Sequence, residues 1–184
     1  SERAVKEKWN LEAVLNNDIM GSNNSSDTRI IDNTRLRVFS EGLPSVLLKD
    51  TTGRIGQIQR FGNENDGKAR NLARYLKDVG ECYVENLEVV MVYRNDRYLR
   101  GGDHTPYVNK GFAAVRMTEM NENYEHQHQD LRTENGIEYG DLIKFMDFDY
   151  LRKNTALNLA TLANLAKSPT MPQQVTIDVR NLTN

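Results

Sequence analysis

The residues best suited to chemistry lie in the polar stretch "NENYEHQHQD", residues 121–130. It contains two of the chain's three histidines, His126 and His128, and the third, His104, lies upstream in "RGGDHTPY". A neutral imidazole is a common zinc ligand, and a carboxylate is its usual oxygen partner. Histidines at i and i+2 of an extended segment point to opposite sides, so one could bind a metal while the other supports the loop. A surface or structural role for each single histidine is the competing interpretation.

Four short segments predict the strands that would position these residues. Residues 35–42 alternate in period 2, and residues 86–94 form a continuous apolar run typical of a strand covered on both faces. Residues 11–18 and 111–119 each pass from apolar to polar, as a buried strand does where it opens into a loop.

Two helices are predicted between and after these strands. One runs from Asp66, a suitable N-cap, to Val79, with Gly80 as its stop. The other is the long amphipathic segment 146–167, which Asp147 can cap. Its expected shared apolar face consists of Phe148, Leu151, Leu159, Leu162 and Ala166.

Strands separated by helices and long loops predict an α/β sheet with helices on its faces. In open α/β sheets, ligands collect at the carboxyl ends of the strands. Asp18 follows the apolar "AVLNN", and Glu119 follows "AAVRM" directly before the histidine loop. We therefore expect Asp18 to lie near His126 or His128. The alternative is that an Asp at a strand end only closes a turn.

Composition excludes several classes of function. The net charge is −2 over 184 residues, with both signs interspersed, which argues against a nucleic-acid partner or a polybasic membrane surface. No apolar run approaches the roughly 20 residues needed to span a bilayer. The single cysteine, Cys82, excludes a disulfide framework within the chain and a thiolate zinc cluster. Neither a Gly-x-Ser-x-Gly motif nor a phosphate-binding glycine loop is present.

Taken in order, three stretches resemble one family. "AVLNNDIMG", "RYLRGGDHTPYVNKGFAAVRMTEMNENYEHQHQDLR" and "YGDLIKFMDFDYLRKNTALNLATLANLA" are similar to the C-terminal part of a co-catalytic two-zinc aminopeptidase. That family includes bacterial leucine-type aminopeptidases, and glutamate carboxypeptidases, the transferrin receptor ectodomain and glutaminyl cyclases are its relatives. The resemblance implies a three-layer α/β/α domain with a mixed, mainly parallel sheet.

The resemblance also implies the organisation of the chain. Residues 1–167 would be the C-terminal portion of the zinc-peptidase domain. Residues 168–184, with the strand-like "VTIDV", would be a linker and the first strand of a following β-sandwich domain. The chain would then be a fragment of a longer protein.

Two zinc ligands can be carried over from the family. Asp18 matches its strand-end aspartate and would be a terminal ligand of one zinc. His126 matches a histidine four residues before an aspartate, here Asp130, and would bind the other zinc. The family's threonine after that histidine is replaced by Gln127. His128 and Asp130 would then belong to the substrate pocket or support the ligands.

Other positions are expected to shape the pocket. Asp103 and His104 match an Asp-His pair that lies near the family's active site without binding metal, and Glu119 belongs with them. Asp103 has a simpler alternative role as the cap of a short helix starting at "TPY". Tyr98 or Arg100 lies where some relatives place a residue that stabilises the tetrahedral intermediate.

The resemblance implies hydrolysis of N-terminal peptide bonds with two zinc ions and a peptide substrate. The general-base glutamate and the remaining ligands are expected upstream of Ser1, so the chain by itself is predicted to be inactive and metal-free. The alternatives are a non-catalytic binding domain on the same fold and, ranked lower, a glutaminyl cyclase-like single-zinc acyltransferase. An exposed sheet edge predicts dimerisation, and the family suggests a secreted or periplasmic protein.

Overall fold

A four-stranded sheet organises the fold. The computed structural model describes residues 1–43, 53–60, 63–98 and 101–169. The strands are β1 (Val14–Asn17), β2 (Arg35–Phe39), β3 (Glu88–Val92) and β4 (Ala114–Glu119), in the spatial order β1-β4-β2-β3. β1 runs parallel to β4 and β2 parallel to β3, whereas β2 and β4 are antiparallel. The sheet is mixed and mainly parallel, which confirms the predicted α/β class.

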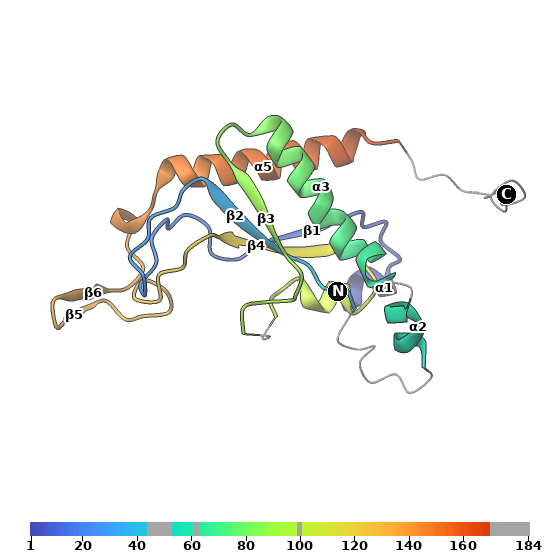
Figure 1. Cartoon of the computed structure of the whole chain (residues 1–184), viewed down its shortest axis with the longest axis horizontal. Coiled ribbons are helices and arrows are strands. Elements are labelled where there is room, and N and C mark those ends of the chain that lie inside the picture. The colour runs from blue at the N-terminus through green and yellow to red at the C-terminus, as the bar shows by residue number, and fades with distance from the viewer. Residues whose placement is uncertain (44–52, 61–62, 99–100, 170–184) are drawn as a thin grey trace, which may run out of the picture.

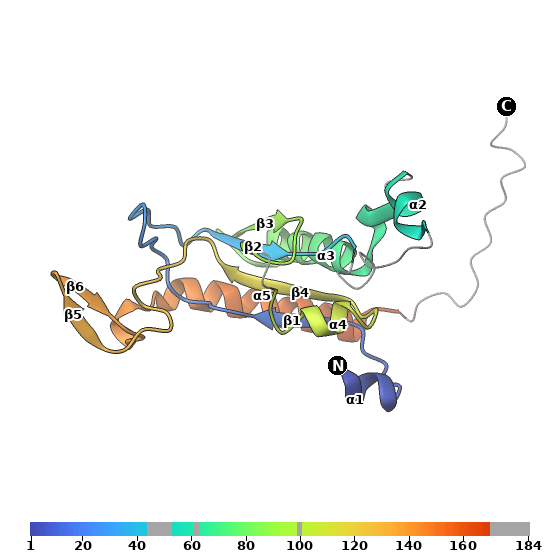
Figure 2. The ribbon, with the colours of Figure 1, turned by 90° about the horizontal axis from the view of Figure 1, so that it is seen from below.

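Two long helices, α3 (Lys68–Tyr83) and α5 (Phe148–Lys167), cover one face of this sheet and pack against each other (Figures 1 and 2). Between the helices and the sheet lies the main hydrophobic core. Its fully buried members come from every layer: Leu36 and Val38 of β2, Val115 and Met117 of β4, Ala73 and Leu76 of α3, and Tyr150 and Leu157 of α5.

Shorter elements surround the sheet. They are the α-helices α1 (Glu2–Lys6), α2 (Arg54–Arg60) and α4 (Thr105–Val108), the 3₁₀ helices η2 (Asn63–Asp66) and η3 (Ile143–Phe145), and the hairpin strands β5 (Arg132–Glu134) and β6 (Ile137–Tyr139). The hairpin projects away from the sheet beyond the start of α5 (Figure 1). The histidine loop runs from β4 to this hairpin.

The second face of the sheet is polar although it is buried. Side chains alternate along β4, so Val115 and Met117 contact the core while Arg116 and Thr118 point to the opposite side. Register pairs Thr118 with Arg37 of β2, which extends the polar face across two strands. Both long helices of the described residues lie on the first face, so one of the two expected outer helical layers is seen. Short α4 packs against β4 on the second face (Figure 2).

Helix α3 differs from its prediction at both ends. It begins after Gly67 and continues to Tyr83, so Asp66 is not its cap and Gly80 does not stop it. Gly80 lies inside the helix where α3 meets the sheet closely: an added Cβ would lie 2.8 Å from Val89 Cγ2. This glycine serves close packing between α3 and β3.

Strand β3 was predicted to be covered on both faces, and this is wrong. It lies at the edge of the sheet, and Val89 is its only buried residue. Tyr93, just beyond the strand, is exposed. The continuous apolar run therefore indicated a strand correctly but not its position in the sheet.

Helix α5 begins at the predicted cap, since Asp147 Oδ1 accepts a hydrogen bond of 3.0 Å from the Tyr150 backbone N–H. Its predicted inner face is wrong, because Phe148, Leu159 and Leu162 are exposed. The inward positions are instead Tyr150, Lys153, Asn154, Leu157 and Thr161.

Polar side chains can face inward on α5 because backbone acceptors of the sheet lie within reach. Tyr150 donates from its hydroxyl to the Arg35 carbonyl at 2.5 Å, and Lys153 donates to the Asn33 carbonyl at 2.8 Å. Each bond offsets the cost of removing the polar group from water. Hydrophobic periodicity alone cannot anticipate such partners.

Two sequence expectations lie outside this description. Residues 170–184 with the predicted strand "VTIDV", and Arg100, are not among the described residues. Within the described residues, no helix is long and apolar enough to cross a membrane.

Candidate functional site

The ends of β1 and β4 meet at Asp18. Its backbone N–H donates to the Met117 carbonyl at 2.9 Å, which ties the residue after β1 to β4. Ile19 follows with φ of +68°, a conformation that a β-branched residue rarely adopts. The Ile19 carbonyl accepts hydrogen bonds from Glu119 N at 3.1 Å and Thr118 Oγ1 at 3.2 Å. Backbone strain held by the surrounding structure in this way is characteristic of functional sites.

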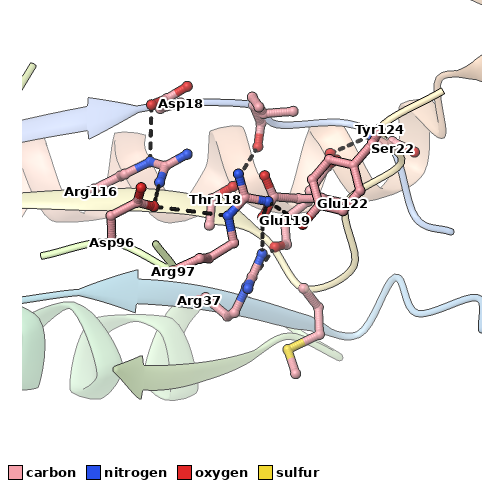
Figure 3. Close-up of polar contacts among 12 residues, drawn as sticks. Asp18, Ser22, Arg37, Asp96, Arg97, Arg116, Thr118, Glu119, Glu122 and Tyr124 are labelled. Carbon is pink, nitrogen blue, oxygen red and sulfur yellow. Dashed lines mark hydrogen bonds and ion pairs between the residues drawn. The ribbon is translucent and has the colours of Figure 1, made fainter. Parts of the chain in front are cut away.

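The Asp18 carboxylate faces a buried arginine of the polar sheet face (Figure 3). Asp18 Oδ2 lies 3.0 Å from Arg116 Nε, an ion pair without hydrogen-bond alignment. Arg116 Nη1 donates to Asp96 Oδ1, and both of these side chains are almost completely buried. The side chain of Asp18 is 39% exposed, so its carboxylate joins this buried pair to the solvent-facing surface.

The charges continue across the sheet face as an alternating series (Figure 3). Arg97 lies 3.9 Å from Asp96 and contacts Glu122, which in turn pairs with Arg37 at 2.5 Å. We call this series the charged ladder; it consists of Asp18, Arg116, Asp96, Arg97, Glu122 and Arg37. Each buried charge in it has an opposite partner, as burial of a charge requires.

A cavity of about 690 Å³ opens beside Asp18. Tyr98 and Tyr124 line it, and their hydroxyl oxygens are 3.4 Å apart. Arg97 donates to the Tyr124 hydroxyl at 2.7 Å, and burial raises the pKa of Tyr124 to about 12. Tyr124 therefore keeps its proton at neutral pH and can donate a hydrogen bond. Tyr98 and Asp18 thus line the same cavity.

His126 lines a second cavity, of about 340 Å³, together with Glu119 and Phe145. Its ring stacks on Phe145 with centroids 3.5 Å apart and an angle of 7°. Burial lowers the pKa of His126, which favours the neutral imidazole that binds metals. Its Nδ1 is buried and has no hydrogen-bond partner among the residues that the structure describes. Asp130, the residue that singled out His126 in the sequence, is exposed.

The two cavities are neighbours, because Ile19, Gln127 and His128 line both of them. Of these two cavities, Asp18 lines the first and His126 the second. His126 also lines a further cavity, of about 320 Å³, beside the β5–β6 hairpin. His128, with a left-handed φ of +54°, is therefore the histidine that shares a cavity with Asp18. Within the part of the chain that the structure describes, no three His, Cys, Asp or Glu side chains are grouped to hold a metal ion.

Glu119 is completely buried at the end of β4. Its Oε2 accepts hydrogen bonds from the backbone N–H groups of Gly21 at 3.1 Å and Ser22 at 2.7 Å. Burial raises the pKa of Glu119 to about 8 despite these donors. The side chain thus holds the loop after Asp18 to β4 and faces the cavity of His126 in a largely protonated form.

Asp103 and His104 occupy unlike environments. Asp103 is exposed, and the N-cap position of α4 is occupied by His104, so the capping alternative for Asp103 is wrong. His104 is fully buried, with Nε2 3.8 Å from Glu41 Oε1. Burial and then the nearby Arg116 lower the pKa of His104. His104 thus lies near Arg116 of the charged ladder and lines neither of the two cavities described above.

Sequence reasoning missed most of the charged ladder and Tyr124. One signal was available: Arg116 interrupts the apolar run "AAVRM", and a charge in a buried strand needs a partner. The identity of that partner was not readable, because Asp96 and Asp18 reach Arg116 from distant segments.

Comparison with known proteins identifies the chain's relatives. It is 49% identical to a probable zinc metalloprotease of Leptosphaeria maculans, over 95% of this chain and 40% of that protein. It is 46% identical to one from Pyrenophora tritici-repentis and 42% to one from Pyricularia oryzae, covering 36% and 35% of those proteins. The chain therefore spans well under half of these relatives. They are fungal, so they do not support a bacterial source. The family model for Peptidase family M28 matches residues 1–148, and the chain belongs to this family.

Proposed function

We propose that the intact protein containing this chain is a zinc-dependent aminopeptidase. The observation that carries the proposal is Asp18, which follows a strand, precedes the strained Ile19 and opens on a cavity. Family membership supports it, as do relatives named probable zinc metalloproteases. Aminopeptidase specificity and a count of two zinc ions rest on the resemblance of the sequence.

Asp18 and His126 are the proposed ligands, one for each zinc. They fit the chemistry, since one is a partly exposed carboxylate and the other is an imidazole kept neutral by burial. Bound zinc would polarise the scissile carbonyl and acidify a water molecule. The other ligands and the general-base glutamate would come from residues outside this chain.

The chain's own groups have further proposed roles. Tyr98 would donate a hydrogen bond to the oxygen of the tetrahedral intermediate, with Arg100 as the alternative. Tyr124, fixed by Arg97, lies within reach of the Tyr98 hydroxyl and would orient it. Glu119 would hold the loop after Asp18, while His128 and Gln127 would line the space between the cavities.

Metal content and turnover of the intact protein test this proposal. We expect zinc by elemental analysis and hydrolysis of aminoacyl-nitroanilides, but no hydrolysis of the same substrates with an acetylated N-terminus. Asp18→Ala and His126→Ala should each lower the zinc content and abolish turnover. Zinc content unchanged in both variants would refute the ligand assignment, and a loss only in His128→Ala would transfer the role to His128.

The same experiment separates the alternatives. Zinc binding without any turnover would favour a non-catalytic binding domain, and cyclisation of peptides with an N-terminal glutamine would favour the acyltransferase. For the 184-residue chain alone, we expect no turnover and no tightly bound zinc, because a catalytic zinc normally has three protein ligands. Turnover by the purified chain would overturn this expectation.

Two further proposals concern the surroundings of the protein. Edge pairing through β1 or β3, the outer strands of the described sheet, would produce dimers detectable by sedimentation at increasing concentration. Secretion of the intact protein is a prediction that cell fractionation would test.

A further inference from the structure

Arg116 contacts the proposed metal ligand from the side of the sheet. Its Nε lies 3.0 Å from Asp18 Oδ2, and its Nη1 is bound to Asp96 (Figure 3). The guanidinium therefore bridges two carboxylates that come from different loops. Asp18 Oδ1 has no partner among the described residues.

The guanidinium itself is fixed firmly. The Arg116 side chain is 4% exposed, and its Cζ lies 5.8 Å from the centre of the Phe39 ring. The side chain of Asp96, its second partner, is 1% exposed. Because β4 supplies Arg116 and the sheet holds β4 on both sides, the direction of the Asp18 ion pair is set by the core of the fold.

The buried Asp96 limits how far Arg116 opposes a cation at Asp18. Arg116 carries one positive charge, and Asp96 balances it within the buried pair. Asp96 also lies 3.9 Å from Arg97, so the three carboxylates and three guanidinium groups of the charged ladder balance as a set. Without Asp96, Arg116 would cancel the charge of Asp18 and oppose a metal ion at the same carboxylate.

We propose that Arg116 is a positioning residue, which holds Asp18 Oδ2 so that Oδ1 is directed to a metal ion, while Asp96 neutralises the guanidinium. The inference rests on the proposed function, in which Asp18 is a zinc ligand. Partners that orient a metal ligand typically contribute about 10–100-fold to metal affinity. Lysine could neutralise one carboxylate but could not bridge both, because it lacks the planar fork of arginine.

The test measures zinc affinity of the intact protein by competition with a chromophoric chelator, alongside the urea midpoint of the same variants. We expect Arg116→Met to weaken zinc binding by about 10–100-fold. Arg116→Lys should bind zinc more tightly than Arg116→Met but more weakly than the unaltered protein. Arg37→Met is the matched control, because Arg37 is a half-buried, paired arginine on the same sheet face that does not contact Asp18. It should shift the urea midpoint and leave zinc affinity unchanged.

The outcomes separate this inference from the proposed function. The role of Arg116 alone would be overturned by one pattern of results. In that pattern, zinc affinity is unchanged in Arg116→Lys and in a folded Arg116→Met, but is lost in Asp18→Ala. Zinc affinity unchanged in Asp18→Ala would overturn the ligand assignment first. If Arg116→Met does not fold, the test depends on Arg116→Lys. A zinc affinity of Arg116→Lys equal to that of the unaltered protein overturns the inference. A weaker zinc affinity without a change in urea midpoint supports it.

Discussion

Replacing Glu119 by glutamine should stabilise the protein at neutral pH and flatten the dependence of its stability on pH. Glu119 is fully buried, and burial raises its pKa from 4.5 to about 8. Between these two values the folded state binds a proton that the unfolded state has lost. The contribution of Glu119 to stability is therefore fully present below pH 4.5 and is lost as the pH rises through about 8.

The size of the effect follows from the pKa difference. Each unit corresponds to about 1.36 kcal/mol, so folding at pH 7 costs roughly 2–3 kcal/mol relative to pH 4.5. Glutamine has the shape of the protonated acid, and its carbonyl can accept the hydrogen bonds from Gly21 and Ser22. The variant keeps these two hydrogen bonds, loses only the long one of 3.5 Å that Oε1 accepts from Gln127 Nε2, and does not titrate.

The assay is equilibrium urea unfolding of both proteins across the interval from pH 4.5 to 8. The free energy of unfolding of Glu119→Gln should exceed that of the unaltered chain increasingly as the pH rises. Glu85→Gln, at an exposed position, is the control and should change nothing. Parallel curves for Glu119→Gln and the unaltered chain would refute the reasoning, because they would mean that Glu119 ionises equally in both states.

Two further predictions concern packing and capping. Gly80→Ala should destabilise the protein by about 1–3 kcal/mol, since the new Cβ would lie 2.8 Å from Val89 Cγ2. Gly56→Ala in α2 meets nothing within 4 Å and should stabilise it by about 0.5–1 kcal/mol. Urea midpoints that shift in the same direction for both would contradict the packing argument. Asp147→Ala should cost about 1–2 kcal/mol by removing the cap of α5, and an unchanged calorimetric Tm would count against it.

The sequence was a good guide wherever one local signal determines the outcome. Alternation at residues 35–42 and apolar segments elsewhere located all four strands of the main sheet, and Asp147 located the start of α5 because a cap acts within one turn. The sequence failed where a distant partner decides. Gly80 lies inside α3 at a close contact with Val89 of the sheet, and Lys153 faces inward because it donates a hydrogen bond to the Asn33 carbonyl.

The candidate site likewise has one feature that a local signal predicts and others that depend on the conformation of a loop. The position of Asp18 at the end of a strand is predictable, because the sequence changes there from apolar to polar residues. The choice between His126 and His128 depends on the conformation of a loop, and His128 adopts a left-handed φ that no spacing rule indicates. The distribution of these two histidines over two adjacent cavities is likewise a property of the loop and of Phe145, on which His126 stacks.

The geometry around Asp18 is determined mainly by β4. Its last residues hold the carbonyl of the strained Ile19, Arg116 holds the carboxylate, and Glu119 holds the two backbone N–H groups that follow. An αL conformation at a residue such as Ile19 costs about 1–3 kcal/mol and would relax if these contacts were absent. Because β4 lies between β1 and β2, the core that fixes it also fixes the loop. Substitutions that loosen β4 from the core, far from any cavity, should therefore disturb the position of Asp18 before they unfold the chain.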